Sequence, residues 1–218
     1  MCARRYIEVT GDTSIVSDYV DRWERLLEGL VALKTSGGAL FDGTDLHPYI
    51  DIAQHDCRKS VNCALNCFFQ KAFIDGAVLL DTVDRDGKNW SELADATAAA
   101  IRASFWDETR GVFVDRLREE VPDTEPSIHG NALAVMFEIA TPEQCDKLKP
   151  WFREAMADNF FGKDRPDERN GVRTNAYFSY YALDALYRLD CPEDALSFMS
   201  TCWGMMLDCG AWTTWESF

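Results

Sequence analysis

The segment from residue 61 to residue 83, VNCALNCFFQKAFIDGAVLLDTV, decides the fold class. Its apolar residues would fall on almost every side of a helix, as the pairs Ala64-Leu65, Phe68-Phe69 and Leu79-Leu80 illustrate. A helix that is apolar all round must be covered on more than one face. The segment therefore predicts a helix packed within another helical layer, as in an α/α toroid.

Further helices are predicted on both sides of this segment. Residues 1–10 are typical of the end of a helix that Gly11 terminates. From Thr13 to Val31 apolar residues recur every three or four positions, which predicts one continuous amphipathic helix. Downstream, helices are expected over Ser91–Phe105, Ser127–Ala140, residues 142–159 with a kink at Pro150, Thr174–Leu189 and Pro192–Leu207.

Two short motifs punctuate the downstream part. Residues 106–116 predict a turn with a short strand or hairpin. Thr141-Pro142-Glu143-Gln144 resembles a capping box with proline at the first helical position. The whole chain, residues 1–218, is thus expected to be one all-α domain. Its helices should form two packed layers, as in an α/α toroid, with about seven to eight helices and almost no strand.

Composition narrows the classes of partner. The chain has 22 Lys and Arg against 37 Asp and Glu, a net charge of −15, and its 7 Trp, 7 Tyr and 13 Phe exclude intrinsic disorder. The acidic excess disfavours nucleic acid and anionic membrane surfaces, which recruit basic residues. The longest uncharged run, Ala195–Leu207, is too short to span a membrane. If Met1 is the natural start, we expect a cytoplasmic protein.

The chain has eight cysteines, and we expect them to be free, mostly buried thiols in a reducing compartment. A chain this long and this rich in core residues does not need disulfides for stability. Neither the cysteines nor the three histidines have the spacing of a metal site. The sequence also contains no nucleotide-binding motif. We therefore expect no metal and no cofactor.

The densest candidate for chemistry is Trp212-Thr213-Thr214-Trp215-Glu216. Sugars present apolar CH faces and hydroxyl groups, so their sites combine aromatic rings with carboxylates. The pKa of a carboxyl group beside indoles can also be raised, as acid–base catalysis requires. The alternative interpretation is a packed terminal tail that carries an exposed glutamate.

A long loop over residues 36–59 is the second candidate, and such loops in compact domains are usually functional. Asp51 is its strongest functional candidate because the neighbouring Ile50 and Ile52 should tether it. The other interpretation is a solvated loop whose aspartates cap turns. Its acids and imidazoles that could bind a polyol, a metal or a proton are Asp42, Asp45, His47, Asp51, His55 and Asp56.

Two helix starts carry weaker candidates. His129 and Asn131 either face a pocket or cap their helix, and capping is the favoured interpretation. Tyr177, Tyr180 and Tyr181 have the spacing of core aromatics, with Tyr177 the best placed to face a cavity.

Four stretches together resemble the bacterial α-L-rhamnosidases of glycoside hydrolase family 78. They are FWDETRGVFVD at 105–115, SIHGNALA at 127–134, TNAYFSYY at 174–181, and the ending WGMMLDCGAWTTWE at 203–216. The ending is similar to the family's Gly-x-Thr-Thr-x-Trp-Glu signature and is the most specific of the four.

The resemblance implies an (α/α)6 toroid that hydrolyses terminal α-L-rhamnosyl residues with inversion, by a carboxylic acid and a carboxylate base. Glu216 matches the general base. The candidate substrate-binding residues are Asp51, His129, Tyr177, Trp212 and Trp215. The family's general acid precedes the part that matches residues 6–12, and this sequence contains no such segment. The isolated chain is therefore expected to be nearly inactive.

Two alternatives stay open. One is an inverting hydrolase or phosphorylase of another sugar on the same toroid. The other is a non-catalytic helical protein that binds a sugar or serves as an interaction scaffold. In all three cases an incomplete toroid would leave an apolar helical face exposed or paired with a second copy in a homodimer.

Overall fold

A computed structural model describes residues 1–218 except 36–37, 43–49, 52–60, 119–120, 124–125, 161–173 and 216–218. The part described is mainly helical, as predicted. Its helices are α1 (Cys2–Thr10), α2 (Ser14–Ser17), α3 (Val20–Val31), α4 (Cys63–Asp81), α5 (Lys88–Phe105), α6 (Ile128–Met136), α7 (Pro142–Phe160), α8 (Ser179–Arg188) and α9 (Pro192–Asp208).

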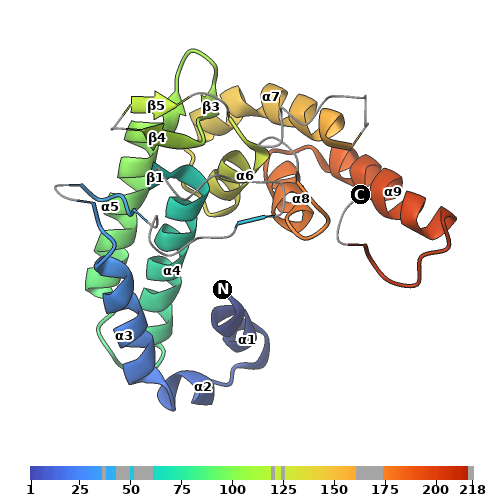
Figure 1. Cartoon of the computed structure of the whole chain (residues 1–218). Coiled ribbons are helices and arrows are strands. Elements are labelled where there is room, and N and C mark those ends of the chain that lie inside the picture. The colour runs from blue at the N-terminus through green and yellow to red at the C-terminus, as the bar shows by residue number, and fades with distance from the viewer. Residues whose placement is uncertain are drawn as a thin grey trace.

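The helices form two layers of a curved wall. Helices α4, α6 and α8 pack side by side in an inner row, and α5, α7 and α9 lie behind them (Figure 1). Helix α1 lies beside α4 at one end of the wall, while α9 extends away at the other end. This two-layered helical arrangement confirms the predicted toroid-like fold.

Helix α4 is covered on more than one face, as its all-round apolarity predicts. Cys63, Ala64 and Cys67 belong to the large core that extends to α9. Phe69 and Phe73, in contrast, belong to a second cluster with residues of α3 and α5. Helix α4 is long and apolar enough to cross a membrane, but 67% of the qualifying stretch is buried within the protein. Its apolarity is thus that of a core helix.

Two small antiparallel sheets complete the described part. Strand β2 (Trp106–Asp107) pairs with β3 (Val112–Phe113), which confirms the hairpin expected near 106–116. A second sheet has the order β1-β4-β5, from Val61–Asn62, Arg116–Arg118 and Val121–Asp123. The sequence predicted almost no strand, so this sheet is a departure from the prediction. Strands of two or three residues are too short to show an alternating pattern, and the sequence therefore does not reveal them.

Several helix boundaries also differ from the predictions. The helix predicted over Thr13–Val31 is divided in two, because Tyr19 has non-helical backbone angles of φ −125° and ψ 13°. Helix α6 stops at Met136 rather than Ala140, since Glu138 takes a left-handed conformation with φ 60°. Helix α8 begins five residues later than predicted, at Ser179. Periodicity alone detects none of these changes, because the apolar phase continues across them.

The capping box at α7 is confirmed in both directions. The backbone N–H of Gln144 donates to Thr141 Oγ1 at 3.2 Å, and the backbone N–H of Thr141 donates to Gln144 Oε1 at 3.0 Å. Each bond satisfies a backbone N–H that the first turn of a helix leaves without a helical partner. The start of α7 is therefore fixed by local sequence alone.

Two buried asparagines anchor α4 and α6 to backbone segments that precede them. On α4, Asn66 Oδ1 accepts from the backbone N–H of Phe41 at 2.8 Å, and Asn66 Nδ2 donates to the carbonyl of Phe41 at 3.0 Å. On α6, Asn131 makes the same pair of bonds with the backbone of Phe113, at 2.8 and 2.9 Å. Each Nδ2 also donates to the carbonyl four residues earlier. Two of the three inner helices, α4 and α6, thus share the same anchor.

Candidate functional site

The N-terminal ends of the three inner helices converge. Cys63 begins α4, and Gly130 lies in the first turn of α6. A Cβ atom on Gly130 would lie 3.3 Å from the Cβ and Sγ of Cys63, so only glycine allows this approach without displacement. Asp51 then connects the start of α6 with the segment before α8. The partial positive charges of these helix ends favour acidic groups nearby.

Asp51 is the centre of this junction. Its Oδ2 accepts from Nε2 of His129 at 2.9 Å and from the backbone N–H of Asn175 at 3.1 Å. Asp51 is only 5% exposed and His129 is fully buried, with its ring 4.2 Å from that of Phe178. A carboxylate held by donors from two helix ends is fixed in position. The junction thus orders Asp51 between the starts of α6 and α8.

The favoured interpretation of His129 and Asn131 as helix caps is wrong. Ser127 is the N-cap of α6, and its Oγ accepts from the backbone N–H of Gly130 at 3.2 Å. His129 instead binds Asp51, and Asn131 binds the backbone of Phe113. The cap position was taken by the serine immediately before the helix, which is among the most favourable N-cap residues.

Asn175 is a member of this junction that the sequence analysis did not single out. Its backbone N–H reaches Asp51, and its carbonyl accepts from Ser179 Oγ at 2.9 Å. The available signal was local, since asparagine near the start of a helix commonly binds backbone groups there. The partner of such a residue across the fold cannot be found from its position in the sequence.

Three tyrosines lie just beyond Asn175. Tyr177 is 64% exposed and is therefore on the surface, where a core or cavity position was predicted. Its hydroxyl lies 3.4 Å from that of the buried Tyr181, and the ring of Tyr180 packs edge-on against Tyr181. Burial, followed by the hydrogen bond with Tyr177, raises the pKa of Tyr181. The group presents exposed aromatic surface beside the Asp51 junction.

The terminal tail presents aromatic surface as well. Trp212 is fully exposed, and Trp215 is partly covered, with its backbone N–H donating to Met206 Sδ at 3.5 Å. At Trp212, therefore, the tail is not packed against helices. The structure brings Asp51 and His129 together, whereas Trp212 and Trp215 lie on a separate segment after α9. Predicted residues outside the described part are Glu216, Asp45, His47, His55 and Asp56.

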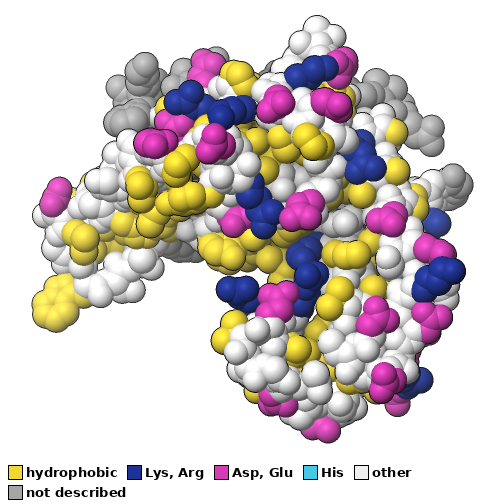
Figure 2. All heavy atoms as spheres, turned by 180° about the vertical axis from the view of Figure 1, so that it is seen from behind, with side chains coloured by type: hydrophobic (Ala, Val, Ile, Leu, Met, Phe, Trp, Pro, Cys, Tyr) yellow, Lys and Arg dark blue, Asp and Glu magenta, His cyan; other side chains and the backbone are white. Residues whose placement is uncertain are grey.

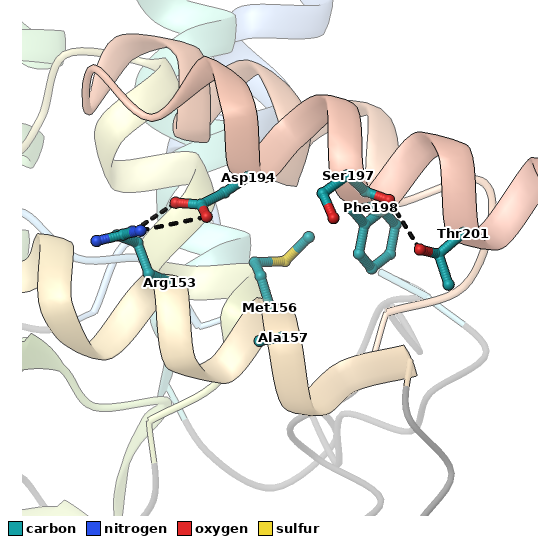
Figure 3. Close-up of a pocket in the computed structure, with 7 residues that line it drawn as sticks. All are labelled: Arg153, Met156, Ala157, Asp194, Ser197, Phe198 and Thr201. Atoms are coloured by element: carbon teal, nitrogen blue, oxygen red, sulfur yellow. Dashed lines mark hydrogen bonds and ion pairs between the residues drawn. The ribbon is translucent and has the colours of Figure 1, made fainter.

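A small hollow of about 80 Å³ lies between α7 and α9 (Figure 3). Arg153 on α7 forms an ion pair with Asp194 on α9 at its edge. None of the predicted site residues lines it. Its walls are formed by Arg153, Met156, Ala157, Asp194, Ser197, Phe198 and Thr201. Among the residues that the structure describes, no three His, Cys, Asp or Glu side chains are grouped to hold a metal ion.

Comparisons with known proteins give matches at the level of structure. No protein-family model matches the sequence, and a search of curated proteins gives no match either. A crystal structure of a GH78 family rhamnosidase of Bacillus sp. GL1 matches with a TM-score of 0.81 over 99% of this chain, at 20% identity. The chain has the fold of a segment of this rhamnosidase. A rhamnosidase from Klebsiella oxytoca with rhamnose bound matches with a TM-score of 0.74, also over 99%, at 17% identity.

The chain spans 22% of the Bacillus rhamnosidase chain and 38% of the Klebsiella one. The resemblance to rhamnosidases drawn from the sequence motifs is thus supported by the fold. Three of those motifs lie at the β2–β3 turn and at the starts of α6 and α8. The last two flank Asp51, so the rhamnosidase-like motifs and the buried junction share one end of the inner helical row.

Proposed function

We propose that this chain forms part of the catalytic domain of an inverting α-L-rhamnosidase-like glycoside hydrolase. The observation that carries the proposal is the match along 99% of the chain with two rhamnosidases, one of them with rhamnose bound. The end of the domain where the inner helices begin would hold the sugar. It offers a fixed carboxylate and exposed aromatic rings, which suit a ligand with hydroxyl groups and apolar CH faces.

The proposed roles follow from the chemistry of each group. Glu216 is the general base that would activate water, as its match to the family signature implies. Tyr177 would stack against the sugar or donate from its hydroxyl. Trp212 and Trp215 would cover the sugar's apolar face. Asp51 and His129 would hold the wall of the site in place, since both are buried and bound to each other.

Hydrolysis by the 218-residue chain alone is expected to be very slow. The sequence has no segment similar to the one that supplies the general acid in the family, and general acid catalysis typically contributes about 10²–10⁴-fold. Sugar binding does not require that acid. Binding, rather than turnover, is thus the appropriate first test.

The test is a titration of the chain with L-rhamnose and with an aryl α-L-rhamnoside, in which binding is measured by calorimetry or ligand-observed NMR. We expect saturable binding that Tyr177→Ala weakens at least tenfold. Tyr187→Ala is the matched control, because Tyr187 is also an exposed tyrosine associated with α8. Binding that is absent, or equal in both variants, would overturn the assignment of this site.

A substrate panel addresses the alternative of another sugar. Preference for a different monosaccharide over L-rhamnose, with the same dependence on Tyr177, would assign the fold to a hydrolase or phosphorylase of that sugar. If the chain releases rhamnose and Glu216→Gln abolishes that release, the chain supplies its own general acid. No binding of any sugar would favour the interaction scaffold.

A further inference from the structure

Helix α9 carries two adjacent apolar stripes. One stripe is buried in the protein and consists of Ala195, Phe198, Cys202 and Met206. The next stripe, here called the α9 stripe, consists of Leu196, Met199 and Leu207. Leu196 is 56% exposed and Leu207 is 72% exposed. The spacing of three and eight residues places them on one side of the helix. Figure 2 shows hydrophobic side chains gathered along the projecting part of the molecule that contains α9.

Helix α1 carries a similar stripe at the opposite end of the wall (Figure 1). None of its residues is buried. Cys2, Tyr6 and Val9, here called the α1 stripe, are exposed and lie on one side of the helix, and Val9 is 70% exposed. The helix is fastened to α4 by Arg4, whose Nη1 lies 3.0 Å from Oδ1 of Asp75. The position of α1 is therefore fixed while its apolar side stays exposed to solvent.

The charges beside the two stripes are opposite in sign. Helix α9 has the acidic residues Glu193, Asp194 and Asp208 and no lysine or arginine. Asp194 is already paired with Arg153 of α7, which leaves Glu193 and Asp208 for a partner. On helix α1, Arg4 is bound to Asp75 and Glu8. Arg5 lies 3.3 Å from Glu8, and its side chain is 77% exposed beside the α1 stripe. Two α9 helices face to face would bring like charges together. An α9 helix against an α1 helix joins apolar surface to apolar surface and acid to base.

We propose that two copies of this chain associate reciprocally, with the α9 stripe of each packed on the α1 stripe of the other. The two stripes lie at opposite ends of the curved wall, with an open notch between α9 and α1 (Figure 2). One twofold axis then satisfies both stripes of both copies and gives a closed pair. This inference goes beyond the proposed function and does not depend on sugar binding.

The test measures the mass of the 218-residue chain by sedimentation and by light scattering across a range of concentrations. We expect a dimer. Leu196→Glu and Val9→Glu should each give a monomer, because each damages both contacts of the symmetric pair. Leu26→Glu, at another exposed leucine outside both stripes, is the matched control and should leave the dimer intact. An unchanged circular dichroism spectrum shows that the variants are folded.

Mixing the two variants separates the reciprocal pair from other arrangements. A mixed pair keeps one intact contact, so Leu196→Glu and Val9→Glu together should form a heterodimer that neither forms alone. The exchange Arg5→Glu with Glu193→Arg should associate at least tenfold more tightly than either single change. A wild-type monomer at all concentrations would overturn the proposal. So would a dimer that Val9→Glu leaves unchanged, since that result would indicate pairing of α9 with α9.

Discussion

Nε2 of His129 lies 2.9 Å from Oδ2 of Asp51, although 78 positions separate the two residues in the chain. Both side chains are buried, and the contact joins the loop before α4 to the first turn of α6. A buried carboxylate is costly without donors. The pair therefore connects the placement of Asp51 to the stability of the inner helices.

Replacing His129 by alanine tests that connection. We expect His129→Ala to lower the free energy of unfolding by about 3 kcal/mol, because it leaves a buried carboxylate without its imidazole partner. Urea denaturation followed by circular dichroism measures the change. Tyr187→Ala, at an exposed ring, should change the free energy by less than about 0.5 kcal/mol. A loss of under about 1 kcal/mol for His129→Ala would show that the pair contributes little.

The two asparagine anchors should be worth similar amounts. Asn66→Ala and Asn131→Ala each leave the backbone of a phenylalanine without its partners, and each is expected to cost about 2–3 kcal/mol. Denaturation of the two variants under identical conditions makes the comparison. If one variant is as stable as the wild type while the other unfolds, the anchors are not equivalent.

Asp75 makes stability depend on acid pH. Burial alone would raise the pKa of Asp75, but the hydrogen bond and charge of Lys71, with other cations beside it, outweigh burial and hold the pKa below its ordinary value of 3.8. A carboxyl group with a lowered pKa in the folded state contributes stability above its unfolded pKa, and this is lost as the pH falls through the folded value. Wild-type protein should therefore lose more stability than Asp75→Asn as the pH falls from about 6 to about 3, the range in which carboxyl groups take up protons. Equal losses measured by urea denaturation would count against this role.

The cysteines should react in two groups. Burial raises the pKa of the Cys202 thiol to about 12, which leaves almost no thiolate at neutral pH. Exposed Cys209, which lies outside both stripes, should be alkylated by iodoacetamide within minutes. Mass spectrometry of peptides after timed alkylation reads both groups, and unfolding in urea should abolish the difference. Fast labelling of the native protein would contradict the packing if it occurred at the buried thiols, which are Cys63, Cys67, Cys191 and Cys202.

The sequence predicts what depends on local pattern. The all-round apolarity of α4 predicted its burial on two faces, and the residues 141–144 predicted the start of α7. The site was less accessible, because Asp51 and His129 could be singled out but their mutual contact could not. Asn175 was missed for the same reason, since its partner lies 124 positions away. Tyr177 was expected to face a cavity, and nothing in its helical spacing distinguishes a buried ring from an exposed one.

The asparagine anchors also bear on how the chain reaches this fold. Asn66 closes a segment of 25 positions back to Phe41, and Asn131 closes one of 18 positions back to Phe113. The entropy cost of closing a loop grows only slowly with its length, and short closures form quickly. Helices α4 and α6 can thus each dock on the segment before them without waiting for the rest of the wall. The chain is expected to fold from several local nuclei, with the contact between Asp51 and His129 forming late.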